Sequence, residues 1–215
     1  QHTGSYAAAF GNRRLMFGAL GIFLYVGAEV AIGSYLVNYF LSLDLAAMIR
    51  SDDFTGSISR TLMGKALEGV DDKGVVGAFA ALYWGGAMVG RFAGSVLTRM
   101  MKPATVLLIF GAAAIILIAT SMSTTGFAAM WSILAVGLFN SVMFPTIFGL
   151  AIEGLGDLKP QGSGILCTAI AGGAFIPPLL GHLADDFGFK TAFILLLACY
   201  GFIAYYAFTN GRQRA

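Results

Sequence analysis

A single acid stands inside a long apolar run of the sequence. Glu29 is the only charged residue between Leu15 and Phe40. A helix over a run of this length crosses the ~30 Å hydrocarbon core of a bilayer, which puts Glu29 near the midplane. An ionised carboxylate at that depth is costly unless it is protonated, paired or hydrated, so we interpret Glu29 as a functional residue. The alternative is a protonated Glu29 that hydrogen-bonds a neighbouring helix and only stabilises packing.

The neighbours of Glu29 along the helix extend this candidate site. Tyr25 lies one turn before Glu29 and Gly33 lies one turn after it. The Tyr25 phenol and the space beside Gly33, which has no side chain, therefore share the helix face of Glu29. Gly33-Ser34 is a weak point at which the helix could unwind and expose backbone groups to a polar ligand. Asn38 is on the opposite face of a straight helix, and it reaches the same cavity only if the helix breaks or bends.

A second group combines an amide with aromatic rings. Asn140 and Phe144 lie one turn apart, directly before Pro145, which removes a backbone donor and favours a kink. Amides hydrogen-bond hydroxyl groups and rings cover an apolar C–H face, so this pair suits a sugar. An interhelical hydrogen bond without a ligand is the alternative role for Asn140. Trp84 is either a cavity wall or an aromatic anchor at the membrane interface.

Other chemistries do not assemble. The two cysteines and two histidines have no metal-ligand spacing, so we expect buried free thiols at Cys167 and Cys199 and no metal site. The net charge of +2 is small and its cations lie at expected helix ends, so the sequence does not indicate nucleic-acid binding. An intramembrane hydrolase or a six-helix channel is the alternative class of function. For a hydrolase, His182 is too far from Ser163 to activate it, and the sequence has no filter-like repeat for a channel.

The composition identifies the elements that must position these residues. The chain is 58% hydrophobic and 11% charged, with a mean hydropathy of +0.80, which predicts an integral membrane protein. The ~10-residue alternation of a membrane β-barrel is absent, so we expect an all-α bundle. We predict one domain over residues 1–215 with six membrane helices at about 15–40, 74–97, 104–122, 127–152, 164–183 and 191–208.

The positive charges set the expected topology. An even number of spans puts both termini on one side, and the excess of Lys and Arg on that side predicts cytoplasmic termini. The opposite side carries one long loop, about Leu41 to Lys73, in which Ile58–Val70 forms either a short amphipathic surface helix or a solvated loop. The cations assigned to the cytoplasmic side are Arg13, Arg14, Arg91, Arg99, Lys102, Lys159, Arg212 and Arg214.

Small residues predict where helices approach closely. Residues of this kind recur every four positions in the second and fifth apolar stretches, which gives each helix a flat packing face. The fifth stretch also carries Gly172-Gly173 and Pro177-Pro178, a second predicted site of bending. The two stripes are Gly86, Gly90 and Gly94, and Gly164, Thr168 and Gly172.

Four segments of the sequence carry a family resemblance. They are YVGAEVAIGSYLVNYF (Tyr25–Phe40), YWGGAMVGRFAGSVLTRM (Tyr83–Met100), NSVMFPTIFGLAIEGLG (Asn140–Gly156) and GSGILCTAIAGGAFIPPLLGHLAD (Gly162–Asp185). In this order they resemble the glucose/galactose branch of the fucose–galactose–glucose–proton symporter family of the major facilitator superfamily. The segments at 90–99 and 181–188 are similar to the loop signatures of that superfamily.

The resemblance implies a fold and a function. Such transporters have twelve helices in two halves, each built from two inverted three-helix repeats, and the six helices here resemble the C-terminal half. The chain begins with Gln1 rather than Met, which fits a missing N-terminal half as its partner. The implied function is cation-coupled uptake of a hexose by alternating access, with proton or sodium as the coupling ion and no other cofactor. A transporter of fucose or an amino sugar is the alternative.

The resemblance also implies roles for individual residues in a multi-pass protein of the bacterial inner membrane. Helices seven, eight, ten and eleven line the sugar cavity in this family, and charged residues at helix ends latch one conformation. For those charges, the alternative is that they are solvated and only set topology. The implied substrate-contacting residues are Tyr25, Glu29, Trp84, Asn140 and Phe144, with Asn38 added from its position, and the implied gating residues are Arg91, Arg99, Asp157 and Asp185.

Overall fold

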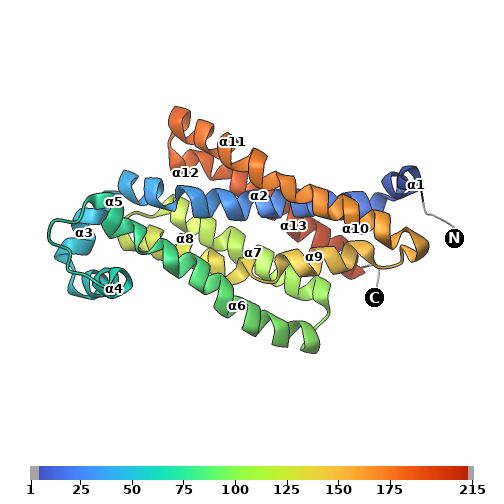
Figure 1. Ribbon diagram of the computed structural model, residues 1–215, viewed down its shortest axis with the longest axis horizontal. Helices are drawn as coiled ribbons and strands as arrows, with labels where there is room; N and C mark the ends of the chain where they lie inside the picture. The colour runs from blue at the N-terminus through green and yellow to red at the C-terminus, as the bar shows by residue number, and fades with distance from the viewer. Residues whose placement is uncertain (1–4, 213–215) are drawn as a thin grey trace.

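The computed structural model describes residues 5–212, and the regular secondary structure of this part of the chain is all helical (Figure 1). The α-helices are α1 (Tyr6–Gly11), α2 (Arg13–Ser42), α3 (Leu45–Ser51), α4 (Asp53–Met63), α5 (Asp72–Gly77), α6 (Ala80–Met100), α7 (Pro103–Ser123), α8 (Gly126–Asn140), α9 (Met143–Ile152), α10 (Lys159–Thr168), α11 (Gly172–Phe187), α12 (Phe189–Ala192) and α13 (Ile194–Arg212). Two short 3₁₀ turns, η1 (Gly156–Leu158) and η2 (Ala169–Ala171), flank α10.

Six segments of the described chain are long and apolar enough to cross a membrane. Two of them, α2 and α7, are single helices, and the other four join neighbouring helices of the list above. Each segment contains one of the six apolar stretches that the sequence predicts. Their bounds are Arg13–Ser42, Asp72–Met100, Pro103–Ser123, Gly126–Ile152, Gly156–Phe187 and Phe189–Gly211.

The helix α2 is the centre of the bundle. It packs against α9, α11 and α13, while α7 packs between α8 and α13 and α6 covers α8. Side chains from the inner face of α2, such as Ile22, Leu36 and Phe40, are fully buried in this core. The helix begins where the Asn12 side chain accepts a hydrogen bond from the Leu15 N–H at 3.0 Å, an N-cap that satisfies one orphan donor. Figure 1 shows α1 at one end of the bundle and α3 and α4 at the other.

The predicted unwinding of α2 at Gly33-Ser34 is wrong. The helix runs without interruption from Arg13 to Ser42. Gly33 serves a different purpose, because a Cβ at this position would lie 2.5 Å from the indole ring of Trp84. Since the helix stays regular, Asn38 points away from Glu29 and is exposed. The expectation that Asn38 joins the same cavity therefore fails.

The predicted kink before Pro145 is confirmed as a complete break. The fourth span divides into α8 and α9, with Ser141 and Val142 between them. Pro145 has no N–H for the carbonyl one turn earlier, so the helix cannot continue unchanged through this point. Local side chains satisfy the carbonyls near the break, because Ser141 Oγ donates to the Leu138 carbonyl at 3.0 Å and Thr146 Oγ1 donates to the Val142 carbonyl at 2.6 Å.

The fifth span is interrupted next to Gly172-Gly173, one of the two predicted sites of bending, but not at Pro177-Pro178, which lie inside α11. A 3₁₀ turn, η2, separates α10 from α11 directly before Gly172. A Cβ on Gly172 would collide with the backbone carbonyl of Phe23, so the bend brings this glycine against α2. Of the predicted small-residue stripe, however, Thr168 is exposed within the described chain. The stripe is therefore a contact at Gly172 and not a continuous packing face.

The other predicted stripe, in α6, packs against α8 as expected. A Cβ on Gly90 would collide with the Leu138 carbonyl oxygen, and one on Gly86 would lie 3.4 Å from the Leu138 backbone nitrogen. A Cβ on Gly94 would collide with the side chain of Val142, at the break itself. Gly86 and Gly90 therefore let α6 lie directly on the backbone of the broken span.

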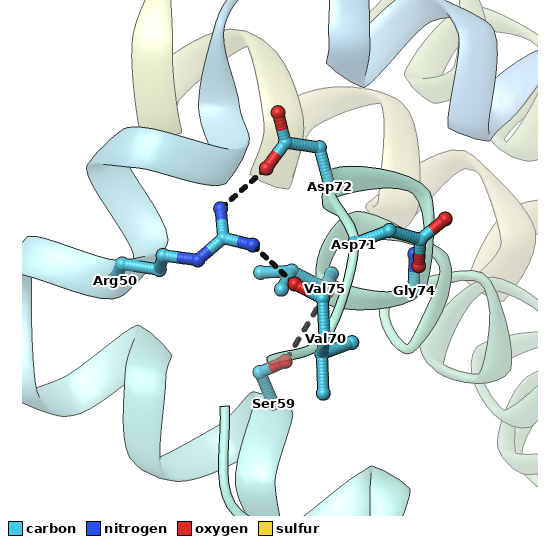
Figure 2. A network of polar contacts seen from close by, with 7 residues as sticks. All are labelled: Arg50, Ser59, Val70, Asp71, Asp72, Gly74 and Val75. Atoms are coloured by element: carbon cyan, nitrogen blue, oxygen red, sulfur yellow. Dashed lines mark hydrogen bonds and ion pairs between the residues drawn. The ribbon is translucent and has the colours of Figure 1, made fainter. Parts of the chain in front are cut away.

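The long loop between the first two spans is folded into two helices. Residues 53–63 form α4, so the surface helix lies earlier than the predicted Ile58–Val70, of which only the first part is helical. Figure 2 shows how this region is tied to α5. Arg50 donates to Asp72 at 2.5 Å and to the Val70 carbonyl at 2.7 Å, and Ser59 Oγ donates to the Val75 carbonyl at 3.1 Å. These bonds connect α3 and α4 to the start of the second span.

Candidate functional site

A cavity of about 810 Å³ opens between α2, α6 and α9. Its volume lies within the range of small-molecule sites. Its walls come from α2, from the part of α6 that carries Arg91, Ser95 and Thr98, and from the break and the helix that follows it. Residues that contribute side chains with polar atoms are Tyr25, Glu29, Arg91, Ser95, Thr98, Ser141, Thr146 and Glu153.

Glu29 and Arg91 are two of the charged residues that line this cavity, and Glu153 is the third. Glu29 is half-buried and Arg91 is exposed. A carboxylate accepts hydrogen bonds and a guanidinium donates them, so together they can bind both hydrogens and oxygens of hydroxyl groups. The arrangement suits a neutral polyhydroxylated ligand.

The predicted position of Arg91 at a cytoplasmic helix end is wrong. The helix α6 continues to Met100, so Arg91 lies about 13 Å from the end of α6 at 1.5 Å per residue. The sequence prediction placed Arg91 at a helix end because residues 90–99 are similar to a loop signature of the superfamily, although the predicted span of 74–97 includes Arg91. The cavity explains the exception, since it offers Arg91 a polar surface at membrane depth.

Of the two aromatic rings predicted beside Tyr25, Phe144 lines the cavity and Trp84 does not. Phe144 is half-buried and lines it, one turn after the end of α8. The ring lies 6.0 Å from that of Phe148 at an interplanar angle of 31°. Trp84 does not line the cavity, because its indole lies over Gly33 and edge-on to Tyr83, with 48% of the residue exposed.

Asn140 does not face the cavity either. It is fully buried, and its amide nitrogen donates to the Tyr83 hydroxyl at 2.8 Å while its amide oxygen accepts from the Tyr200 hydroxyl at 2.7 Å. Its backbone carbonyl accepts from the Tyr25 hydroxyl at 2.7 Å. Asn140 therefore makes interhelical hydrogen bonds, the alternative that the sequence left open, and it has no exposed surface.

The sequence indicated Tyr25 as a site residue, but it did not indicate Tyr83 and Tyr200, the two tyrosines that bond the Asn140 side chain. Tyr83 and Tyr200 come from α6 and α13, and each looks like one more aromatic residue in an apolar helix. Their hydroxyl groups meet Asn140 across 57 and 60 residues of chain, so no local spacing reveals the contact. The one available signal was that a buried tyrosine hydroxyl needs a hydrogen-bond partner.

The remaining charged residues lie outside the cavity. Arg99, Asp157 and Asp185 are exposed, and no ion pair within residues 5–212 involves them. At the end of the bundle where α2 begins, Arg14 and Glu153 form an ion pair at 3.5 Å instead. It links the first turn of α2 to the residue that follows α9.

The cysteines differ from the expectation in one respect. Cys199 is buried as predicted, but Cys167 is exposed within the described chain because α10 turns that face away from the bundle. Among the residues searched in the structure, no cluster of three or more His, Cys, Asp or Glu side chains could hold a metal ion.

Named relatives and one solved structure identify the architecture. The chain is 43% identical over 206 residues, 96% of its length, to a glucose/galactose transporter of Brucella abortus, and it covers 44% of that protein. It superposes on the crystal structure of the major facilitator superfamily transporter FucP in the outward conformation with a TM-score of 0.80 and 25% identity. That match covers 98% of this chain and 46% of the other. The chain has the fold of half a major facilitator transporter.

The resemblance found in the sequence is thereby confirmed, although no protein-family model matches the chain. A second relative, the L-fucose-proton symporter of Escherichia coli, is 29% identical over 213 residues. That match covers 95% of this chain and 42% of the symporter. The chain therefore spans about half the length of the curated relatives that it matches. These relatives are transporters and not enzymes, and the major facilitator half is a multi-pass membrane domain.

Proposed function

We propose that this chain is the C-terminal half of a secondary active sugar transporter and forms one wall of its substrate site. The observation that carries the proposal is the cavity that brings Tyr25, Glu29 and Phe144 together in a chain 43% identical to a glucose/galactose transporter. The substrate is a hexose such as glucose or galactose. Fucose is the second candidate, and the lower identity to the fucose symporter favours the hexose.

Each cavity residue has a role in this proposal. The Glu29 carboxyl accepts hydrogen bonds from sugar hydroxyls, Arg91 donates to them, and the Phe144 ring covers the apolar C–H face of the sugar. The N-terminal half supplies the opposite wall. Transport follows when the two halves rock about this site and open it to one side of the membrane at a time.

The proposal also assigns the coupling ion and the orientation. Uptake is coupled to a cation, either the proton or sodium, and no other cofactor takes part. Both termini face the cytoplasm of a bacterial inner membrane, as the distribution of Lys and Arg indicates. Arg99 and Asp157 at the cytoplasmic end, and Asp185 at the other, are exposed and available to form state-dependent ion pairs with the N-terminal half.

Uptake assays on the complete transporter test this proposal. We expect gradient-driven accumulation of labelled glucose or galactose, with competition by unlabelled hexose and weaker competition by fucose. Collapsing the proton gradient and the sodium gradient separately identifies the coupling ion, because only one treatment should abolish accumulation. Accumulation that ignores both gradients, or a substrate panel in which no sugar is transported, would contradict the assignment.

A further inference from the structure

Asn140 sits where four spans meet. It ends α8, and its side chain and backbone bind tyrosines from α2, α6 and α13. Its side-chain oxygen and nitrogen are each used once, and its backbone carbonyl is used by Tyr25. Buried polar networks with every group satisfied stabilise one arrangement of the elements that they join.

The network reaches both α2 residues of the sugar site. The Tyr25 hydroxyl is bound directly to the Asn140 carbonyl. Glu29 is held through its backbone, because the Tyr83 hydroxyl that accepts from Asn140 donates in turn to the Glu29 carbonyl at 3.1 Å. Asn140 thus constrains the segment of α2 that presents the carboxyl group to the cavity.

The same residue constrains the α9 wall of the cavity, which carries Phe144. Phe144 follows Asn140 by one turn, beyond the break at Ser141 and Val142. In an unbroken helix the Asn140 carbonyl would accept the N–H of residue 144, and here the Tyr25 hydroxyl binds that carbonyl. The position of Phe144 relative to Glu29 therefore depends on the bonds that Asn140 makes.

We propose that Asn140 is a positioning residue that sets the distance between Glu29 and Phe144 across the sugar site, with Tyr83 and Tyr200 as its anchors. The inference rests on the proposed function for the identity of the ligand. It assigns Asn140 no contact with the sugar, since the residue is fully buried and its amide group is occupied by the tyrosines.

Tyr200 provides the discriminating variant. It is fully buried in α13 and does not line the cavity. Tyr200→Phe therefore removes one hydrogen bond to Asn140 without changing the identity of any side chain that lines the cavity. Asn140→Leu removes both side-chain bonds and is the stronger change. Tyr39→Phe is the matched control, because Tyr39 is an equally buried tyrosine whose hydroxyl bonds Ser121, at another place in the bundle.

The experiment measures sugar affinity and cavity geometry in the same variants of the complete transporter. Spin labels on Val26→Cys in α2 and Gly149→Cys in α9 report the distance across the cavity, in a background that lacks the exposed thiol of Cys167. A Cβ at Gly149 meets no atom within 4 Å, so a label fits there. Equilibrium binding of the transported hexose gives the affinity.

We expect Tyr200→Phe to weaken hexose binding roughly tenfold and Asn140→Leu to weaken it further, and both to shift or broaden the label distance. Tyr39→Phe should change neither quantity. Weaker binding with an unchanged distance would overturn the positioning role, and so would an unchanged affinity or an equal effect of Tyr39→Phe. A shifted distance in a protein that binds no sugar would refute the proposed function and leave the positioning role intact.

Discussion

The hydroxyl of Tyr25 in α2 donates a 2.7 Å hydrogen bond to the backbone carbonyl of Asn140, the last residue of α8 before the break. Tyr25 is 3% exposed, so water cannot replace this bond easily. A side chain from the first span therefore satisfies a backbone group of the fourth. The bond links the packing of the bundle to the wall of the cavity.

Removing that hydroxyl should destabilise the protein. Tyr25→Phe leaves a buried carbonyl unpaired, which costs about 1 to 3 kcal/mol. We expect a lower unfolding temperature for the complete transporter and weaker hexose binding. Tyr205→Phe is the control, because 55% of Tyr205 is exposed, and it should leave both quantities unchanged. Equal unfolding temperatures for Tyr25→Phe and the parent would show that the bond contributes nothing.

Glu29→Gln tests the charged wall of the cavity. The amide keeps the size of the side chain but loses the negative charge and one acceptor. We expect normal membrane expression, with most sugar accumulation lost or the affinity for sugar substantially weakened. Glu68→Gln, in an exposed stretch of the loop between the first two spans, should transport as the parent does. Parental uptake and affinity in Glu29→Gln would remove Glu29 from the site.

Phe144→Ala tests the aromatic wall. Loss of the ring removes the surface that covers the apolar face of the sugar, and aromatic contacts of this kind contribute about 0.5 to 1.5 kcal/mol. We therefore expect hexose binding to weaken by roughly 2- to 12-fold in isotherms. Phe187→Ala, which removes an exposed ring far from the cavity, is the control. Matching isotherms for Phe144→Ala and the parent would exclude the ring from the site.

Two glycines of α6 should respond oppositely to alanine. A Cβ on Gly90 would collide with the Leu138 backbone, whereas one on Gly85 meets no atom within 4 Å. We expect Gly90→Ala to destabilise by about 1 to 3 kcal/mol, because two backbones must separate. Gly85→Ala should be neutral or stabilise by up to about 1 kcal/mol through helix propensity. Thermal unfolding of both variants checks the contrast, and a tolerated Gly90→Ala would contradict the close approach.

The cap of α4 should depend on pH. The backbone N–H and the hydroxyl of Thr55 bind the Asp52 carboxylate at 2.8 and 2.7 Å and hold its pKa below the ordinary value. A lowered pKa in the folded state means that the cap stabilises α4 fully above the ordinary aspartate pKa. The stabilisation is lost as the pH falls through the lowered pKa.

Hydrogen exchange on α4 measures this effect. At pH 7 we expect faster exchange in Asp52→Ala than in the parent, and the difference should disappear at strongly acid pH. Asp53→Ala, which changes an acid of the first turn without removing the cap, should exchange as the parent does at both values. A difference between Asp52→Ala and the parent that persists in acid would mean that the charge of Asp52 is not responsible.

The sequence by itself determined the membrane spans, the break before Pro145 and the close packing of the α6 glycines. These features follow from local chemistry: the length of apolar runs, the missing N–H of proline and the absent Cβ of glycine. It also found Glu29 and Phe144, because an acid in an apolar helix and a ring beside a proline are visible without any partner. The resemblance to a known family supplied the fold of the half transporter.

The tertiary structure alone decided which polar side chains face the cavity. Asn140 turned inward because Tyr83 and Tyr200, 57 and 60 residues away, satisfy its amide group. Arg91 lines the cavity well before α6 ends at Met100, and Asn38 lies outside it because α2 stays regular at Gly33, where Trp84 needs the space. Each outcome depends on a contact between distant segments, and helical periodicity along one segment contains no information about its partner on another.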